Sequence, residues 1–460
     1  MTIHVRGSLT VKDVAVMTGG RLVGPSDSDI LEITTDSRDI GQSALFIAIR
    51  GDRFDGNDYV SSAVEKGAVC VLCERIPHNF KGSAVIVDDT RIAMGALAKA
   101  YKAKISPITV GVTGSVGKTT TKEFIYSVLS ERYNTLKTCG NYNNEIGLPM
   151  TVLGLAPDND AAVLEMGMSA KGEIDYLSNI ARPNIAVITN IGTSHIGNLG
   201  SREAIRDAKM EIKNGLSENG ILILNGDEPL LAGVEGALYV ALSNPKADCF
   251  ADNIIEGEHG TAFDLVLRGE RFECITIPTV GVHNVLNAAF AWMVGTVVGI
   301  GEFQMRRGLM KFKNVGMRQS VYIANSRIII EDCYNASPES MIASLKVLCN
   351  MSKQRGRRSV AVLGDMKELG EYSVDGHRKV GEAVASCGVE VLVTFGPEAE
   401  EIARSAVSSG MNAEQVYTFS DLEDAKALGK ALLRISKRGD ILLFKASRAV
   451  SLERAIAFIK

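Results

Sequence analysis

The chain has 460 residues, a formal net charge of -4 at pH 7, and a composition that is 46% hydrophobic and 23% charged. This length exceeds the ~250–300 residues at which single cores stop growing, which predicts two or three domains. The acidic balance argues against a general nucleic-acid binder, which carries a basic face. The N-terminal segment has no signal-peptide pattern, and the longest nearly apolar run, 288–301, is shorter than the ~20 residues of a membrane span.

The eight cysteines are scattered without a disulfide framework, which indicates a reducing compartment and a cytoplasmic protein. Cys70 and Cys73 form a C-x-x-C inside the strand-like run GAVCVLCE, where residues three apart face opposite ways. This placement favours core thiols over a metal or redox site.

The first part of the chain, residues 1–104, alternates short strands with helices. Its strand-like runs are SALFIAIRG, VCVLCE and SAVIVDD, and its helices are DYVSSAVEKGA and residues 90–104. From residue 108, a strand, a glycine-rich loop and a helix precede three further apolar strands, AAVLEMG, IAVITNIG and ILILNGDEP. Such strands separated by helices predict a parallel sheet covered on both faces. Segments around FDLVL and RFECITIPTVG predict a small antiparallel addition, closed by a helix at 284–298.

After residue 316, strands alternate regularly with helices. The strands are RIIIEDC, SVAVLGD, EVLVTFG, QVYTFSD and ILLFKAS, a pattern typical of a Rossmann-like doubly wound sheet. No G-x-G-x-x-G follows the first of them, so we expect no dinucleotide site there. We therefore predict an α/β protein of three domains: a small α/β domain at 1–104, a central P-loop parallel-sheet ATPase domain at 105–313, and a C-terminal Rossmann-like domain at 314–460.

A glycine-rich loop between the strand ITVGVTG and the next helix carries the clearest chemical signal. Its residues are Thr113, Gly114, Ser115, Val116, Gly117, Lys118, Thr119 and Thr120. Glycines let successive N–H groups point into one concavity that binds phosphate oxygens, and the helix N-terminus adds positive charge. Lys118 is expected to reach the β- and γ-phosphates and Thr119 to ligate Mg²⁺. The usual first glycine is replaced by Val112, but the strand, the helix and the GKTT ending favour ATP binding over a chance turn.

Three residues of the central part could surround the phosphates. Glu165 ends a strand at its carboxyl edge, where α/β sheets bind ligands and a carboxylate suits a hard cation; the alternative is an ordinary surface acid. His195 also follows a strand end, although a lone loop histidine is more often structural. Lys209 would by itself be read as a solvated helix lysine.

Later polar residues offer a second group. Asn284 could cap its helix or, with Asn287 one turn on, read an adenine edge, since an amide both donates and accepts. Arg318 could approach a γ-phosphate if the C-terminal domain closes; the alternative is a surface arginine near a linker. Each of these assignments is weak when it is taken singly.

Taken together, seven segments resemble the Mur ligases, which build the peptide stem of the bacterial cell-wall precursor. These segments are TGSVGKTTTKE (113–123), NYNNEIGLP (141–149), EMG (165–167), TNIGTSHIGNLGS (189–201), AKMEI (208–212), GVHNVLNAA (281–289) and EDCYNASPESM (331–341). The glycine spacing that departs from the general P-loop is the family's own version. Within the family, NYNNEIGLP, DCYNASPESM, VLGDMKELGEYSVDGHRKVG (362–381) and FKASRAVSLE (444–453) are most similar to the member that adds D-alanyl-D-alanine.

The resemblance implies roles for individual residues. It implies Mg²⁺ ligation by Glu165 and His195, and a carbamoylated Lys209 able to support a second Mg²⁺. It implies adenine-side amides at Asn284 and Asn287.

It further implies a γ-phosphate contact from Arg318 and a ribose contact from Asp332. The implied substrate-binding residues are Asp36, Ser37 and Arg38 for the uridine nucleotide and Asn143, Asn144, Tyr334 and Asn335 for the peptide substrates. Asn57 stands where histidine is usual, Ala446 where glycine is usual, and Cys333 where serine or alanine is commoner.

The implied reaction joins UDP-N-acetylmuramoyl-tripeptide to D-alanyl-D-alanine through an acyl phosphate, with ATP and Mg²⁺ as cofactors, in a monomer. Two alternatives stay open. One is a sibling ligase or a folylpolyglutamate-type relative, against which the YNASPESM segment argues. The other is a regulatory switch that hydrolyses ATP to change shape, which does not need Lys209 or His195.

Overall fold

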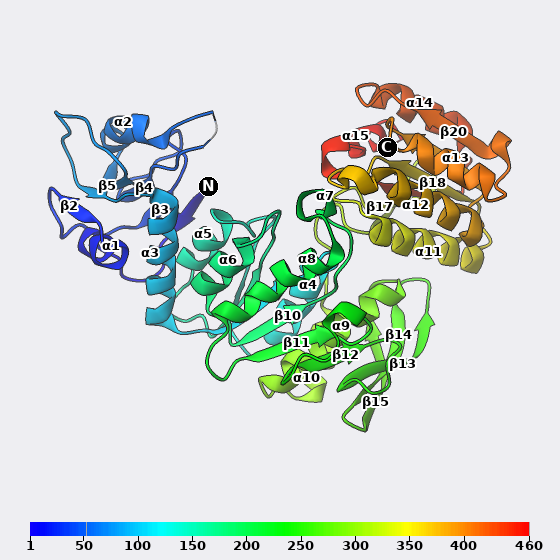
Figure 1. Ribbon diagram of the computed structural model, residues 1–460, viewed down its shortest axis with the longest axis horizontal. Coiled ribbons are helices and arrows are strands. Elements are labelled where there is room, and N and C mark those ends of the chain that lie inside the picture. The colour runs from blue at the N-terminus through cyan, green and yellow to red at the C-terminus, as the bar shows by residue number, and fades with distance from the viewer. Residues whose placement is uncertain (52, 460) are drawn as a thin grey trace. The chain divides into compact units, whose positions relative to one another are not determined.

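The computed structural model describes residues 1–51 and 53–459 and contains three β-sheets, which confirms the α/β class (Figure 1). Each sheet lies within one of the three ranges expected from the sequence. By its internal contacts the chain divides into two compact units. The first comprises Met1–Thr113, Arg132–Val187 and Met210–Leu222, and the second comprises Gly114–Glu131, Ile188–Lys209 and Ile223–Lys460.

The first sheet belongs to the first unit and has the strand order β1-β3-β4-β5-β6-β2. Its elements are β1 (Thr2–His4), α1 (Val11–Thr18), β2 (Arg21–Val23), β3 (Glu32–Thr34), β4 (Ala44–Ile47), α2 (Val60–Glu65), β5 (Ala68–Cys73), β6 (Ala84–Ile86) and α3 (Thr90–Ile105). The four inner strands are parallel, and β1 and β2 pair antiparallel at the edges. Cys70 and Cys73 are buried on β5, as expected for core thiols, and burial raises the pKa of Cys70 to about 12.

The second sheet has the strand order β15-β14-β13-β12-β11-β10-β7-β9-β8. Its strands are β7 (Ile108–Thr113), β8 (Thr135–Lys137), β9 (Ala161–Glu165), β10 (Ile185–Ile188), β11 (Ile221–Asn225), β12 (Leu238–Ala241), β13 (Cys249–Glu256), β14 (Thr261–Leu267) and β15 (Glu270–Ile277). In the first unit β7 and β8 both pair parallel with β9. In the second unit β11, β12 and β13 are parallel, whereas β13, β14 and β15 form the expected antiparallel addition.

The helices of this central region include α9, which was expected at 284–298. The helices are α4 (Lys118–Leu129), α5 (Gly147–Leu153), α6 (Glu173–Ala181), α7 (Ile196–Leu199), α8 (Arg202–Met210), α9 (Val282–Val297) and α10 (Glu302–Met310). α9 packs against α4, and its apolar run is buried core. Asn284 lies in its first turn and Gly281 is the N-cap residue, so the capping interpretation of Asn284 is wrong. No helix in the described part of the chain is long and apolar enough to cross a membrane.

The third sheet has the order β16-β17-β21-β18-β19-β20 and lies between layers of helices (Figure 1). Its elements are β16 (Ser320–Ala324), β17 (Arg327–Glu331), α11 (Pro338–Arg355), β18 (Ser359–Gly364), α12 (Ser373–Cys387), β19 (Val391–Phe395), α13 (Glu400–Ser408), β20 (Val416–Phe419), α14 (Ala425–Ile435), β21 (Ile441–Lys445) and α15 (Glu453–Ile456). The five expected strands are present and parallel. β16 was not foreseen. It pairs antiparallel with β17 across a two-residue turn, Asn325 and Ser326, in which both residues have positive φ.

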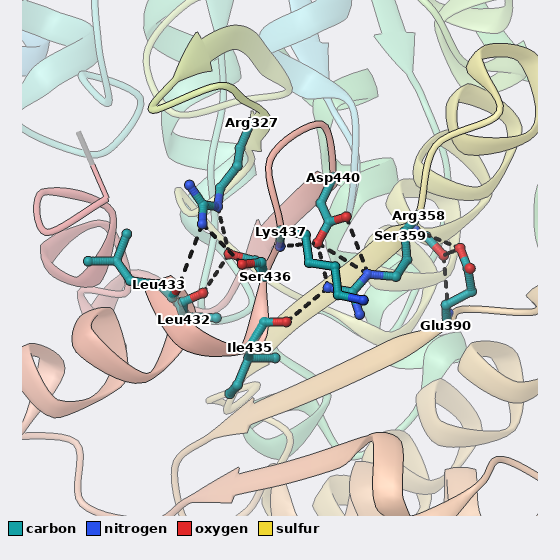
Figure 2. Close-up of polar contacts among 10 residues, drawn as sticks. All are labelled: Arg327, Arg358, Ser359, Glu390, Leu432, Leu433, Ile435, Ser436, Lys437 and Asp440. Atoms are coloured by element: carbon teal, nitrogen blue, oxygen red, sulfur yellow. Dashed lines mark hydrogen bonds and ion pairs between the residues drawn. The ribbon is translucent and has the colours of Figure 1, made fainter.

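Two arginines tie together the chain around the amino ends of this sheet (Figure 2). The Arg358 guanidinium donates to Asp440, with a shortest distance of 2.6 Å, and to the Ile435 carbonyl at 2.9 Å. Arg327 donates to the Ser436 hydroxyl at 2.7 Å and to its carbonyl at 3.0 Å. Asp440 is 4% exposed, so this pair is shielded from water and has a larger effect on stability than a surface pair.

We predict that Asp440→Ala lowers the local stability of the C-terminal sheet by about 2–3 kcal/mol, because the Arg358 guanidinium and the Lys437 N–H lose their acceptor. Hydrogen exchange of the β18 and β21 amides, followed by mass spectrometry in a urea series, measures this change. The matched control is Arg404→Ala, which removes an exposed ion pair with Glu401 and should change stability by less than about 0.5 kcal/mol. Equal effects of both substitutions would contradict the prediction.

Candidate functional site

The glycine-rich loop joins β7 to α4 and depends on two glycines. Gly114 has φ +149°, and a Cβ there would lie 1.9 Å from the Thr189 hydroxyl oxygen. Gly117 has φ +85°, and a Cβ there would lie 2.9 Å from Asn287 Oδ1. Both the backbone conformation and the available space therefore require glycine at these positions.

Within the second unit, oxygen atoms close to the loop accept its polar hydrogens. The N–H groups of Ser115 and Val116 donate to Asn190 Oδ1 at 3.1 and 2.9 Å. The Lys118 ammonium turns back and donates to the carbonyls of Gly114 and Ser115 at 2.7 and 3.3 Å. Two backbone donors and a cation at the N-terminus of a twelve-residue helix form an arrangement suited to anionic oxygens.

Lys209, on α8 of the same unit, is buried rather than solvated. Its exposed fraction is 1%, so the interpretation as a surface helix lysine is wrong. Burial first, and then the positive charge of Lys118, lower the pKa of Lys209 well below its ordinary value. Burial and the neighbouring ammonium therefore both favour the neutral, nucleophilic form of this amine over its charged form.

Glu165, in the first unit, is also buried, with 1% exposure, so it is not an ordinary surface acid. The Asn143 side-chain amide donates to Glu165 Oε1 at 2.9 Å, and the Glu165 N–H donates to the Thr138 hydroxyl at 3.0 Å. The Thr113 hydroxyl at the end of β7 donates to the Met166 carbonyl at 2.9 Å. Asn143 thus orients this carboxylate, a role that the sequence did not indicate.

His195 precedes α7 with φ +65°, a conformation that costs energy for a residue with a side chain. Its Nδ1 lies 2.7 Å from Glu368 Oε2. The neighbouring Gly197 N–H donates to the Glu368 carbonyl at 3.1 Å, and Tyr372 donates to the Gly200 carbonyl at 2.8 Å. These contacts fix the loop of His195, and His195 lowers the pKa of Glu368.

A series of hydrogen bonds, three between side chains and one from the Gln319 backbone N–H, links α4 to the C-terminal sheet. The Thr121 hydroxyl donates to Asn287 Oδ1 at 2.9 Å, and Asn287 Nδ2 donates to Asn284 Oδ1 at 3.2 Å. Asn284 Nδ2 then donates to Gln319 Oε1 at 3.2 Å, and the Gln319 N–H donates to Asp332 Oδ1 at 3.2 Å. We call these five residues the amide relay.

Asp332, at the end of the amide relay, also holds two other groups. Its Oδ2 accepts from the Lys445 ammonium and from the Ser344 hydroxyl, both at 2.6 Å. Nearby, the Arg318 guanidinium stacks 3.6 Å from the centroid of the Tyr334 ring. That cation–π contact orients the arginine, so it is not a free surface side chain. The Asn335 carbonyl accepts from Lys445 at 3.2 Å.

In the first unit, the segment expected at the uridine nucleotide is held by a local ion pair. Arg38 binds Asp36 through Nε at 2.8 Å and Nη2 at 2.7 Å, and this pair holds the pKa of Asp36 well below its usual range. The Ser37 carbonyl accepts from Lys66 at 2.6 Å. Asn144 accepts from the Gly147 N–H at 2.9 Å, which fixes the start of α5.

The three residues that depart from the family pattern are all buried. Asn57 is buried, donating to Asp55 and accepting from the Glu74 N–H, both at 2.8 Å. Ala446 is fully buried, and a Cβ added at Gly364 would lie only 2.7 Å from the Ala446 methyl group. Cys333 is a buried thiol 3.3 Å from the Phe444 carbonyl.

Several residues of the site were given no role from sequence, because their hydrogen-bond partners are distant in the chain. They are Thr121, Thr189, Asn190, Gln319, Glu339, Glu368 and Lys445. Glu339, for example, accepts from the Thr193 N–H at 3.0 Å and from its hydroxyl at 3.1 Å. Six of these residues lie inside the segments that resemble the family, so a signal was present for them, whereas Gln319 lies outside those segments and only adjoins Arg318.

We predict that Gly114→Ala weakens ATP binding at least about tenfold, because the new methyl collides with Thr189 and strains the loop. Isothermal titration calorimetry measures the affinity. Gly301→Ala is the control, since that glycine has φ -70° and a Cβ there would make only an ordinary contact, at 3.6 Å, with the flexible Gln304 side chain. Unchanged affinity of the Gly114 variant would show that the loop tolerates a side chain there.

Three family models match the chain in order. They are "Mur ligase family, catalytic domain" at residues 29–104, "Mur ligase middle domain" at 112–295, and "Mur ligase, glutamate ligase domain" at 317–448. Together these models cover most of the chain.

Curated relatives and solved structures match over nearly the whole length. The UDP-N-acetylmuramoyl-tripeptide–D-alanyl-D-alanine ligases of Bacillus subtilis (strain 168) and Escherichia coli (strain K12) are 41% and 34% identical, covering 97% and 98% of both chains. A crystal structure of MurF from Acinetobacter baumannii matches with a TM-score of 0.89 at 29% identity, covering 99% of both chains. MurF from Thermotoga maritima in complex with ADP matches with a TM-score of 0.82 at 31% identity, covering 93% of this chain and 96% of that one. This chain belongs to the Mur ligase family.

Proposed function

We propose that this chain joins D-alanyl-D-alanine to the carboxylate of UDP-N-acetylmuramoyl-tripeptide, with conversion of ATP to ADP and phosphate. The observation that carries the proposal is the burial of Lys209 near the Lys118 ammonium of the glycine-rich loop, which lowers the pKa of Lys209. An ATPase that only changes shape has no need of a second, buried lysine beside the lysine of its phosphate loop. The Bacillus subtilis and Escherichia coli relatives are ligases named for these two substrates, which supports the same substrates here.

The chemistry follows from the poor leaving group of a carboxylate. Attack of the tripeptide carboxylate on the γ-phosphorus releases ADP and yields an acyl phosphate, whose phosphate is a good leaving group. The dipeptide amine then adds to the acyl carbon, and phosphate departs from the tetrahedral intermediate. Lys118 and Arg318 supply positive charge for the phosphoryl oxygens, and Tyr334 holds the Arg318 guanidinium in place. Water must be excluded, because it would hydrolyse the acyl phosphate.

We assign Lys209 as a carbamate. The neutral form of the lysine amine adds to carbon dioxide and loses a proton. A side chain that is ordinarily a cation thereby becomes an anionic oxygen ligand. The lowered pKa of Lys209 makes the amine available for this step, whereas a protonated lysine cannot react. The carbamate would also offset the charge of Lys118.

We assign Mg²⁺ to Thr119, Glu165, His195 and the carbamate of Lys209. Among residues 1–51 and 53–459, no three His, Cys, Asp or Glu side chains gather as a self-contained metal site. Mg²⁺ fits this donor set nonetheless, since it binds through one or two carboxylates and substrate phosphates and keeps several waters. Bound there, it would neutralise charge on the phosphates. Glu368 beside His195 Nδ1 leaves Nε2 as the ligating nitrogen.

The remaining assignments are proposals of binding. Asn284 and Asn287 flank the adenine, and Asp332 lies near the ribose. The uridine nucleotide is assigned to Asp36, Ser37 and Arg38, and the peptide substrates to Asn143, Asn144, Tyr334 and Asn335. We further propose the domain boundaries 104/105 and 313/314, a monomer, and action in the cytoplasm, which the eight unpaired cysteines support.

We predict that the purified chain forms UDP-N-acetylmuramoyl-pentapeptide from ATP, UDP-N-acetylmuramoyl-tripeptide and D-alanyl-D-alanine, as weighed by mass spectrometry. Release of phosphate from ATP should require both the carboxylate substrate, UDP-N-acetylmuramoyl-tripeptide, and the amine substrate, D-alanyl-D-alanine. Lys118→Ala should lower turnover by more than about a thousandfold, because the γ-phosphate loses its cation. The control is Lys99→Ala, which removes an exposed lysine on the surface of α3 and should leave turnover unchanged.

The tripeptide is offered with lysine or diaminopimelate as its third residue, to decide which one is used. Phosphate release that is unchanged by either acceptor substrate would favour the switch. A product with a single amino acid would favour a sibling ligase.

We predict that Lys209 carries a carbamate at neutral and alkaline pH and loses it as the pH falls, because protons release carbon dioxide from carbamates. ¹³C NMR after incubation with ¹³C-bicarbonate should give one carbamate signal, absent in Lys209→Met. Lys209→Met should also lose at least about a hundredfold in turnover. A signal that persists in this variant, or full activity without the lysine, would contradict the assignment.

A further inference from the structure

A group of exposed cations lies at the amino ends of the strands of the C-terminal sheet. Five side chains belong to it, and we call them the basic patch. All five are exposed, and among residues 1–51 and 53–459 none of them forms an ion pair with a carboxylate. They are Lys430 and Arg434 on α14, Lys437 and Arg438 in the turn before β21, and Arg357 before β18.

The fold brings the two segments that carry these cations together. β18 and β21 are parallel neighbours with Ser359 opposite Ile441, so the residues that precede the two strands meet at one edge of the sheet. A Cβ added at Gly439 would lie 2.5 Å from Arg357 Nη1. The Arg357 guanidinium therefore lies against the turn between α14 and β21, which holds two of the other cations.

No nearby acid offsets this charge. Lys430 and Arg434 are four positions apart and so lie on one face of α14. Asp440 follows the turn, but it is buried and bound to Arg358, which makes that pair neutral. Asp424 is the N-cap residue of α14 and lies at the opposite end of the helix. Because the whole chain has a net charge of -4, the basic patch is a local reversal of its overall charge.

Large apolar side chains are exposed beside the basic patch. Leu433 on α14 is 37% exposed and Phe458 is 43% exposed. Phe458 packs across α14, since a Cβ added at Gly429 would lie 2.6 Å from its Cβ, and Leu433 follows Gly429 by one turn on the same face (Figure 1). Ile323 on β16 is 75% exposed and pairs with Ile328 near the amino end of β17. The same edge of the sheet therefore presents both cations and apolar groups.

We propose that the basic patch and these apolar side chains dock the chain on an anionic lipid surface. Clusters of about four to eight Lys and Arg side chains are attracted to anionic headgroups, each adding to the binding. Exposed apolar side chains gain further free energy in the boundary between headgroups and acyl chains. A nucleic acid offers the negative charge but no apolar layer, whereas a lipid surface offers both.

Docking at this edge leaves the ligation site open. β17, β18 and β21 run parallel, and Asp332 and Lys445 lie at the carboxyl ends of β17 and β21. The basic patch lies at the amino ends. A strand of five residues separates the two edges by about 16 Å at 3.3 Å per residue. The contact is thus peripheral, and it does not depend on which substrates the chain ligates.

The test is cosedimentation of the full-length chain with vesicles of phosphatidylcholine, alone or with about 30 mol% phosphatidylglycerol. We expect binding only to the anionic vesicles, at least about tenfold weaker at high salt because the charges are screened. Lys437→Glu/Arg438→Glu should lower the partition coefficient at least about tenfold. Leu433→Gln/Ile323→Thr, which keeps the charge, should lower it at least about threefold. Circular dichroism and the thermal midpoint check that both variants are folded.

Lys12→Glu/Lys99→Glu is the matched control, since it changes the net charge equally at exposed lysines of α1 and α3; it should bind like the wild type. The proposal is overturned if the wild type does not sediment with the anionic vesicles, if neutral vesicles bind it equally well, or if the control loses as much affinity as Lys437→Glu/Arg438→Glu. Unchanged binding of folded Leu433→Gln/Ile323→Thr would also overturn it, and would assign the basic patch to a charged polymer such as RNA.

Discussion

The amide relay from Thr121 to Asp332 is the constraint on which the second unit depends. Its amides are buried, and a buried donor or acceptor without a partner costs about 1–3 kcal/mol. Each amide both donates and accepts, so the orientation of Asn287 determines that of Asn284, and Asn284 in turn accounts for the position of Gln319. Asn287 Oδ1 also lies where a side chain on Gly117 would be. The conformation of the phosphate loop and the position of Asp332 are therefore determined together.

A second constraint is electrostatic. Burying Lys209 near Lys118 is unfavourable for two charged ammonium groups, and the structure resolves this by lowering the pKa of Lys209. The same shift makes the amine reactive toward carbon dioxide, so the cost of burial and the chemistry have one origin. His195 follows a similar logic. It occupies a left-handed conformation that is unfavourable for a residue with a side chain, and Glu368 contacts its Nδ1. Strain at a residue of this kind is typical of functional sites.

The sheets could be predicted because their signals are local. Apolar runs bounded by turns identified the parallel strands, and the predicted helix at 284–298 is found at Val282–Val297. β16 was missed because the run from Val321 to Glu331 alternates through a two-residue turn that carries no glycine. Asn190 and Gln319 were missed for a different reason. An amide that is hydrogen-bonded within the protein looks the same in sequence as a solvated one, because the donors to Asn190 and Gln319 lie 75 and 35 residues away.

The sequence by itself determined the α/β class, the order of the sheets, the phosphate loop and the family, because each of these depends on periodicity and on motifs that are contiguous in the chain. The tertiary structure alone decided the state of the side chains. It buried Lys209 and Glu165, which sequence reasoning could equally treat as surface residues, and it stacked Arg318 on Tyr334. Burial and pairing depend on which distant segments pack together, and that information is not contained in any single stretch of the chain.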